Sequence, residues 1–135
     1  MNLKIKNALV SVSDKENIIS LLKIFKKYKI RVISSGGTYK FIKKLGYDCT
    51  ELSKYTGFKE MLDGRVKTLH PKIHAGILHD RENRAHKQQM FKQKFPPIDL
   101  IVVNFYPFQK VVRVAKNSKN IIENIDIGGP TMVRA

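Results

Sequence analysis

The chain reads NALVSV at residues 7–12, a short run of apolar and β-branched residues that predicts a β-strand. SDKE follows at residues 13–16 with the spacing of a helix capping box, and apolar residues then recur at helical spacing between lysines. These patterns predict a helix from about Asp14 to Tyr28. The stretch is therefore expected to be a strand that leads directly into a helix.

A second strand–helix unit follows at once. IRVIS at residues 30–34 predicts a strand, SGGT at residues 35–38 predicts a tight connection, and residues 38–45 predict a helix closed by Gly46. Two such units in succession imply a parallel sheet, because strands that run in the same direction need a crossover connection. We therefore expect an α/β fold.

The rest of the chain gives signals of uneven strength. The strongest is IDLIVV at residues 98–103, a nearly continuous apolar run that is typical of a parallel strand buried on both faces. Residues 53–80 have no clear period and are expected to be loop-rich, with Ile77 and Leu78 in a short strand; a loop of that length suggests function. The other expected elements are a weak strand at 47–51, helices at 81–95, 109–115 and 121–124, and a glycine turn at 126–131 that enters a helix at Thr131.

The composition is that of one globular domain. Of the 135 residues, 42% are hydrophobic and 27% are charged, and no apolar run approaches the length of a membrane span. Residues 1–6 lack the continuous apolar stretch of a secretory signal, so we expect a cytoplasmic protein. Cys49 is the only cysteine, which excludes an intramolecular disulfide, and the four histidines lack the spacing of a metalloprotease helix. We expect no metal site.

The charge balance raises nucleic acid as a rival partner. The chain has 26 Lys and Arg against 11 Asp and Glu, a formal net charge of +15 that would attract any polyanion. The basic residues are spread over most segments instead of one helix or tail, which is typical of solvated helix faces. This distribution predicts no nucleic-acid partner and no membrane partner.

The segment GRVKTLHP at residues 64–71 places two cations, a hydroxyl group and an imidazole in one short stretch bounded by glycine and proline. Arg65 offers a planar fork that matches phosphate or carboxylate, while Lys67 is a compact charge. Together these side chains indicate an anionic substrate. The alternative is a basic surface loop that ends in a proline-initiated helix.

Both strand-to-helix junctions could hold an anion. Residues 11–15 and 34–38 can each direct free backbone N–H groups and a hydroxyl at a ligand. Neither matches the loop that binds nucleotide triphosphates, and the dinucleotide glycine pattern is absent, so a monophosphate fits better than ATP or NAD. The alternative is that Ser13 and Thr38 only cap helices.

Two further side chains have open interpretations. Asp126, next to a glycine pair, is a candidate base, although such an aspartate is more often a turn or cap residue. Tyr106 follows the strand at residues 98–103, near the edge where open α/β sheets bind ligands, and either contacts a ligand or packs its ring.

Seven segments, in the family's order, closely resemble the inosine monophosphate cyclohydrolase domain, which in that family is the N-terminal part of the bifunctional purine-biosynthesis enzyme. They are residues 11–15, 35–38, 57–61, 64–71, 74–78, 104–108 and 125–129. The resemblance runs from about residue 7 to the end of the chain.

The resemblance implies a methylglyoxal synthase-like fold, an α/β three-layer sandwich around a mainly parallel sheet. It also implies a reaction. In the family, the carboxamide nitrogen of 5-formamidoimidazole-4-carboxamide ribonucleotide attacks the formyl carbon of the same molecule, and loss of water gives inosine monophosphate. No cofactor or metal is required for this ring closure, and a homodimer is implied.

The resemblance also assigns roles to residues. Those implied to surround the reacting groups are Lys67, Tyr106 and Asp126, with Lys67 and Tyr106 stabilising the oxyanion and Asp126 removing the proton. Those implied to bind the nucleotide, mostly its phosphate, are Ser13, Lys15, Ser35, Gly36, Gly37, Thr38, Arg65 and Thr68. Those implied to orient the base are Asn104, Ile127 and Gly128.

The chain departs from the family pattern at its C-terminus. The family's domain continues with an Ala-Ala-Lys-Asn segment whose lysine joins the catalytic group, and this chain ends before it. We therefore expect residues 1–135 to be a truncated cyclohydrolase domain without the formyltransferase domain. The full-length parent would also transfer a formyl group from 10-formyltetrahydrofolate. The alternative is a domain of the same fold that binds a nucleotide phosphate without catalysis.

Overall fold

A parallel sheet of four strands forms the centre of the computed structural model, which describes residues 3–115 and 117–135. The strands are β1 (Asn7–Ser11), β2 (Arg31–Ser34), β3 (Thr50–Glu51) and β4 (Leu100–Val103). Their order across the sheet is β3-β2-β1-β4, and every pairing is parallel. The parallel sheet predicted from the two strand–helix units is confirmed.

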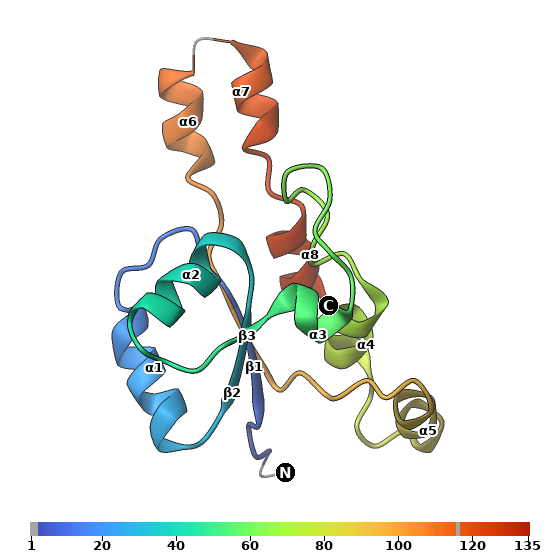
Figure 1. The fold of residues 1–135 in the computed structure, drawn as a ribbon. Helices are drawn as coiled ribbons and strands as arrows, with labels where there is room; N and C mark the ends of the chain where they lie inside the picture. The colour runs from blue at the N-terminus through green and yellow to red at the C-terminus, as the bar shows by residue number, and fades with distance from the viewer. Residues whose placement is uncertain (1–2, 116) are drawn as a thin grey trace.

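Helices cover both faces of this sheet and complete a three-layer sandwich (Figure 1). Helices α1 (Ile18–Lys27) and α2 (Gly36–Lys44) lie on one side, and α3 (Leu52–Thr56), α4 (Pro71–Leu78) and α8 (Gly128–Arg134) lie on the other. Residues alternate between the two faces along a strand, so Ala8 and Val10 enter the core under α1 and α2, while Leu9 enters the core under α3 and α4. The sandwich expected from the family resemblance is confirmed.

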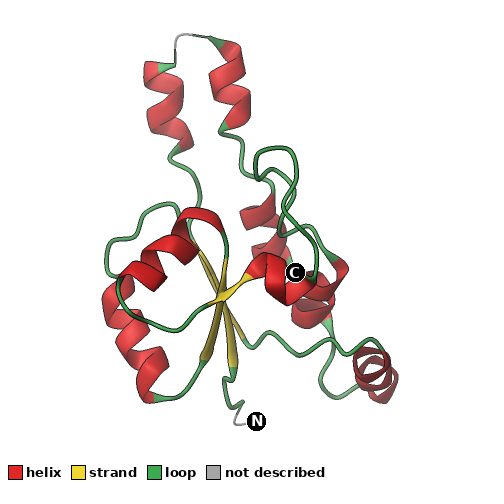
Figure 2. Ribbon diagram, in the orientation of Figure 1, coloured by secondary structure: helices red, strands yellow, loops and turns green. Residues whose placement is uncertain are grey.

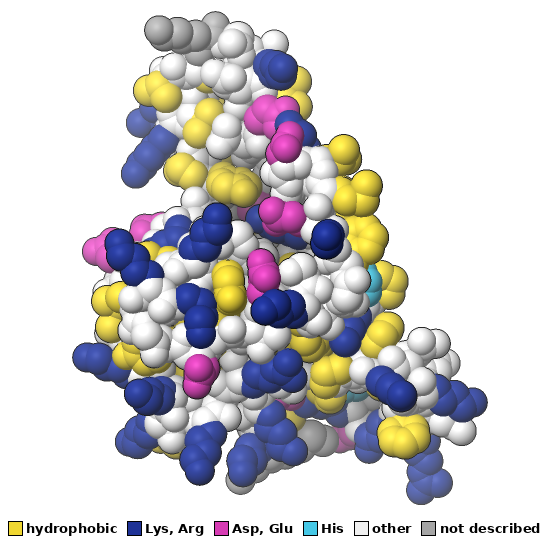
Figure 3. Space-filling view, in the orientation of Figure 1, with side chains coloured by type: hydrophobic (Ala, Val, Ile, Leu, Met, Phe, Trp, Pro, Cys, Tyr) yellow, Lys and Arg dark blue, Asp and Glu magenta, His cyan; other side chains and the backbone are white. Residues whose placement is uncertain are grey.

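Three helices lie apart from the sandwich (Figures 1 and 2). Helix α5 (Arg84–Lys92) extends beyond α4, and α6 (Phe108–Val114) with α7 (Ser118–Glu123) forms a protruding hairpin that we call the arm. Neither α6 nor α7 contributes a buried residue among those described. Lys and Arg side chains are spread over the face shown in Figure 3 instead of being gathered in one patch.

Residues 53–80 form more regular structure than the sequence indicated. The expected loop holds most of α3 and all of α4, and Ile77 and Leu78 lie in helix α4, not in a strand. Helix α4 begins at Pro71, and the Nδ1 atom of His70 accepts a hydrogen bond of 3.1 Å from the backbone N–H of Lys72. Ile73 of this helix is fully buried in the core. The period was missed because α4 has only 8 residues, about two turns.

The capping box predicted at residues 13–16 does not form. Helix α1 begins at Ile18, after Asn17 in a left-handed conformation with φ of 64°. The backbone N–H of Ser13 instead donates to the side chain of Asn104, 91 residues away in the sequence. A tertiary contact therefore replaces the local cap.

Other element boundaries shift by a few residues. The strand expected at 47–51 is reduced to β3, and the helix expected at 81–95 is α5, which Asn83 caps by accepting hydrogen bonds from the N–H groups of Ala85 and His86. The last helix begins at Gly128, so the expected glycine turn is its first turn. No helix of the described residues is long and apolar enough to cross a membrane.

Asp99 ties the start of β4 to the start of β1. Its side chain is 4% exposed and accepts hydrogen bonds from the backbone N–H groups of Lys6 (2.7 Å) and Asn7 (2.8 Å) and from Nη1 of Arg81 (2.7 Å). Burial raises the pKa of this carboxyl, but the hydrogen bonds and the charge of Arg81 outweigh burial, so the pKa lies below its usual value.

We expect Asp99→Asn to lower the free energy of unfolding at pH 7 by about 2 kcal/mol, because an amide nitrogen would face N–H donors in a buried site. The stabilisation from the ionised carboxylate is complete above its unfolded pKa of about 4 and is lost as pH falls through the lower folded pKa. The difference between wild type and variant should therefore shrink in acid. Urea unfolding from pH 7 to pH 2.5 measures this, with exposed Asp48→Asn as the control. A difference that stays constant over this range would contradict the assignment.

Candidate functional site

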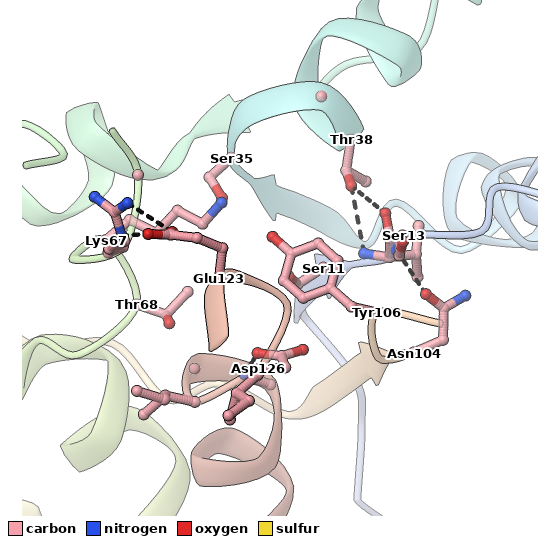
Figure 4. A pocket seen from close by; sticks show the side chains of 18 of the residues that line it. Ser11, Ser13, Ser35, Thr38, Lys67, Thr68, Asn104, Tyr106, Glu123 and Asp126 are labelled. Carbon is pink, nitrogen blue, oxygen red and sulfur yellow. Dashed lines mark hydrogen bonds and ion pairs between the residues drawn. The ribbon is translucent and has the colours of Figure 1, made fainter. Parts of the chain in front are cut away.

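A cavity of about 600 Å³ lies where the carboxyl ends of β1, β2 and β4 meet. The segments that follow these strands, together with the loop at residues 63–68 and the start of α8, form its walls (Figure 4). Its size is within the usual range for small-molecule sites. The cavity is at the edge of the sheet where open α/β folds bind ligands.

The structure brings almost all of the sequence-predicted site residues to this one cavity. Those that line it are Ser13, Lys15, Ser35, Gly37, Thr38, Arg65, Lys67, Thr68, Asn104, Tyr106, Asp126, Ile127 and Gly128. Gly36 instead lines an adjoining cavity of about 290 Å³, which shares Ser35 and Lys67 with the first. Clustering supports a common site, and the individual roles of these residues stay predictions.

The first turn of α2 and the ammonium group of Lys67 meet at one corner of the cavity, which we call the anion-binding corner after its expected ligand. Ser35 precedes the helix in an extended conformation and makes no side-chain cap, so the first N–H groups of this nine-residue helix are not occupied by its hydroxyl. Gly36 has φ of +52°, and a Cβ atom there would lie 3.6 Å from Nζ of Lys67. An ammonium group beside the positive end of a helix dipole favours an anion between them, although Glu51 and Glu60 line the same adjoining cavity as Lys67. This corner therefore suits a phosphate group.

Two polar side chains shape the loop between β1 and α1 instead of facing the cavity as free groups. The hydroxyl of Thr38 donates to the carbonyl of Val12 (2.8 Å) and accepts from its N–H (3.3 Å). The amide oxygen of Asn104 accepts from the N–H groups of Ser13 (2.6 Å) and Asp14 (3.2 Å), and its amide nitrogen donates to the carbonyl of Asp14 (2.8 Å). The alternative in which Ser13 and Thr38 cap helices is wrong, because Asn17 precedes α1 as its N-cap and Thr38 lies inside α2, whose N-cap is Ser35.

Asp126 has one oxygen engaged in structure. Its Oδ1 accepts a hydrogen bond of 3.0 Å from the N–H of Gly129 at the start of α8, which is the turn role considered from the sequence. A Cβ atom at Gly129 would lie 2.7 Å from Oδ2, and one at Gly128 would fall on Oγ1 of Thr68. The glycine pair therefore lets α8 approach both Asp126 and the loop at residues 63–68. A catalytic role for the other oxygen stays a prediction.

Arg65 is less available to a ligand than the sequence indicated. Its Nε (3.0 Å) and Nη2 (2.6 Å) both donate to Oε2 of Glu123 at the end of α7, and its Nη1 donates to the carbonyl of Leu62 (3.1 Å). The hydrogen bond and charge of Glu123, with the charge of Asp63, raise the pKa of the Arg65 guanidinium above its ordinary value. The Nε and Nη2 edge of the Arg65 guanidinium, which was expected to bind phosphate, is therefore paired with the carboxylate of Glu123.

The cavity includes residues to which the sequence assigned no role. They are Ser11, Val12, Asp63, Gly64, Ile122, Glu123, Ile125 and Gly129. Glu123 is the charged residue among them that pairs across the cavity, and nothing in its local sequence distinguishes it from any exposed glutamate. Only its position in the fold reveals it.

The histidines do not gather into a metal-binding group. Among the described residues, no group of three or more His, Cys, Asp or Glu side chains is placed to hold a metal ion. His70 serves as the N-cap of α4, and burial together with the charge of Lys72 lowers its pKa. The imidazole of the segment at residues 64–71 thus has a structural task.

Comparisons with known proteins find related sequences. The model of the MGS-like domain family matches residues 17–131. The chain is 49% identical over 130 residues to the bifunctional purine biosynthesis protein PurH of Persephonella marina, and 47% identical over 133 residues to that of Magnetococcus marinus. These alignments cover 96% and 98% of this chain and 25% of each relative, so the chain spans about a quarter of the length of the curated relatives that it matches.

A solved structure supports the same fold. The crystal structure of ForH superimposes with a TM-score of 0.77 and 30% sequence identity, covering 96% of this chain and 66% of that chain. The predicted resemblance of fold and sequence is confirmed.

We expect His70→Ala to lower the free energy of unfolding at pH 7.5 by about 1 kcal/mol, whereas His70→Asn should retain most of the stability because asparagine also caps helices. Only the neutral ring can accept the N–H of Lys72. The contribution of His70 is therefore present above its ordinary pKa of about 6.5 and is lost as pH falls through the lower folded value. Urea unfolding at pH 7.5 and pH 4.5 measures both effects. Equal stabilities of wild type and His70→Ala at pH 7.5 would rule out the cap.

Proposed function

Because the chain belongs to the family of MGS-like domains, we propose that it is the inosine monophosphate cyclohydrolase part of a purine biosynthesis protein. The proposed substrate is 5-formamidoimidazole-4-carboxamide ribonucleotide. The observation that carries the proposal is the single cavity that joins the anion-binding corner of α2 and Lys67 to Tyr106 and Asp126. Relatives at 47–49% identity are named for purine biosynthesis.

The phosphate of the nucleotide would occupy the corner formed by the first N–H groups of α2. The ammonium of Lys67 lies beside this helix end, and Lys15 lines the same cavity. A dianionic phosphate at this corner would interact favourably with both the Lys67 ammonium and the positive end of the helix dipole. In this position Lys67 fits a phosphate contact better than the oxyanion role expected from the sequence.

The base would lie toward Tyr106 and Asp126. Ring closure forms a bond between the carboxamide nitrogen and the formyl carbon, and the formyl oxygen leaves as water with one proton from the carboxamide nitrogen and one from the formamido nitrogen. The Tyr106 side chain is 46% exposed and could donate its hydroxyl to the developing oxyanion, while Oδ2 of Asp126 could accept the carboxamide proton. The cavity would hold the two reacting groups face to face.

The proposal includes no cofactor and no metal, because an internal condensation with loss of water transfers no electrons and no external group. It also includes a cytoplasmic location and a homodimer. Apolar residues such as Phe108 (40% exposed), Val112 (45%) and Ile122 (64%) on the arm support association, since the described residues of α6 and α7 include none that is buried and both helices would gain stability from a covering surface.

A domain that binds a nucleotide phosphate without catalysis is a second candidate. It is favoured by the pairing of Arg65 with Glu123 and of Asp126 with the N–H of Gly129, since both leave fewer free groups in the cavity. The two candidates share the phosphate corner and differ in turnover.

Lys67→Ala is expected to lower kcat/KM for ring closure at least ~100-fold with the fold intact, because the phosphate loses its charge-assisted contact. The measurement is the ultraviolet absorbance change as the formylated ribonucleotide closes to inosine monophosphate. Exposed Lys87→Ala on α5 is the matched control for loss of one positive charge. Near-normal turnover by the Lys67 variant would contradict the proposed phosphate contact. Binding without turnover by a chain extended through the Ala-Ala-Lys-Asn segment of the family would favour the second candidate.

The phosphate corner should prefer a nucleotide to a small phosphate. Inosine monophosphate is expected to raise the melting temperature at concentrations at which dihydroxyacetone phosphate does not, because the purine adds contacts along the cavity. A thermal-shift titration of the wild-type chain with the two ligands measures this. A larger shift with dihydroxyacetone phosphate would point instead to methylglyoxal synthase chemistry.

A further inference from the structure

Glu123 makes the contact that joins the two sides of the cavity mouth. It is at the end of α7, while Arg65 belongs to the loop at residues 61–69, which we call the cationic loop because it contains Arg65 and Lys67. The carboxylate oxygen Oε2 accepts from Nε and Nη2 of Arg65 at 3.0 Å and 2.6 Å. Figure 4 shows the Glu123 side chain reaching this contact from the opposite wall.

Few hydrogen bonds tie the cationic loop to the rest of the chain, and Thr68 near its end is buried against the start of α8. Its backbone closes on itself through hydrogen bonds between Met61 and Val66, and Leu62, Asp63 and Gly64 all have positive φ. Among the described residues, the hydrogen bonds that leave this loop for a distant part of the chain are those from Arg65 to Glu123. The long-range hydrogen bonding of the part of the loop around Arg65 therefore depends on one carboxylate.

The geometry orients the guanidinium as well as holding it. Two N–H groups on one edge go to a single oxygen of Glu123, and a third N–H, from Nη1, goes to the carbonyl of Leu62. A planar guanidinium held at three donors has a fixed plane, and its remaining N–H groups have fixed directions.

Global stability does not explain this ion pair. The side chains of Arg65 and Glu123 are 54% and 39% exposed, and pairs of this kind contribute little to folding. A carboxylate at the wall of a cavity for an anionic ligand would also oppose binding by its charge. We expect the electrostatic repulsion between Glu123 and the ligand to be offset, because the ion pair with Arg65 orders the cationic loop for binding.

We infer that Glu123 is a positioning residue, which through Arg65 holds the exposed part of the cationic loop, and with it Lys67, in the arrangement that binds the nucleotide. This inference rests on the proposed function. Glu123 acts on the substrate through Arg65, and the arm consequently takes part in binding although none of its helices supplies a core residue.

Three variants separate positioning from charge. Glu123→Ala removes the acceptor and the charge, while Glu123→Gln removes the charge and keeps an oxygen that can accept from both nitrogens of Arg65. Glu82→Gln, on an exposed residue outside the cavity, controls for the change of net charge. Each variant is compared with the wild-type chain by calorimetric titration of inosine monophosphate and by hydrogen exchange of the amides of residues 61–69 without ligand.

We expect Glu123→Ala to weaken nucleotide binding about tenfold and to speed exchange in the cationic loop, while exchange in α5 stays unchanged. Glu123→Gln should recover part of both losses, and Glu82→Gln should behave as wild type.

Equal or tighter nucleotide binding by Glu123→Ala would overturn the inference, because Glu123 would then be a competitor of the ligand. Unchanged loop exchange in Glu123→Ala would also overturn it, whether or not nucleotide binds. Failure of the wild-type chain to bind inosine monophosphate, with loop exchange that still responds to Glu123→Ala, would instead refute the proposed function and the nucleotide part of the inference.

Discussion

Strand β1 lies between two parallel neighbours, and this alignment is the constraint on which the rest of the structure depends. Val10 is in register with Ser34 of β2, and Ser11 is in register with Val103 of β4. Parallel strands in register end at the same edge of a sheet. The loops that follow β1, β2 and β4 therefore meet, and the cavity forms between them.

The two hydrophobic cores, one on each face of the sheet, fix the position of this edge. Ala8 and Val10 pack under α1 and α2, while Leu9 packs with Ile73 and Met132 from α4 and α8. Burying Met132 brings the start of α8 against the cationic loop, and glycine at position 128 allows the approach to Thr68. The burial of Met132 in the core thus determines how closely α8 and the cationic loop, two walls of the cavity, approach each other.

The groups around the cavity divide into those that hold the walls and those that remain for a ligand. Thr38 and Asn104 use their hydrogen bonds on residues 12–14, and His70 uses its own on α4. The first turn of α2 and the ammonium of Lys67 are arranged differently, because two positive features adjoin and an anion would satisfy both. We propose that a phosphate binds there, and that the Arg65 to Glu123 pair sets the position of the opposite wall.

The amino-acid sequence alone determined the strands β1, β2 and β4 and the helices α1 and α2, because strand and helix periodicity and glycine turns are local properties. The resemblance of seven segments to a known family identified most of the cavity residues. It did not determine α4, because two helical turns carry too few apolar positions for a clear period and become stable only by packing Ile73 into the core. It indicated a capping box at Ser13, but Asn104 takes the Ser13 N–H from a distance of 91 residues. Only the tertiary structure decided this contact, the ion pair between Arg65 and Glu123, and the position of the Lys67 ammonium beside the start of α2. Each of them joins groups far apart along the chain, and their energies depend on a geometry that no local pattern encodes.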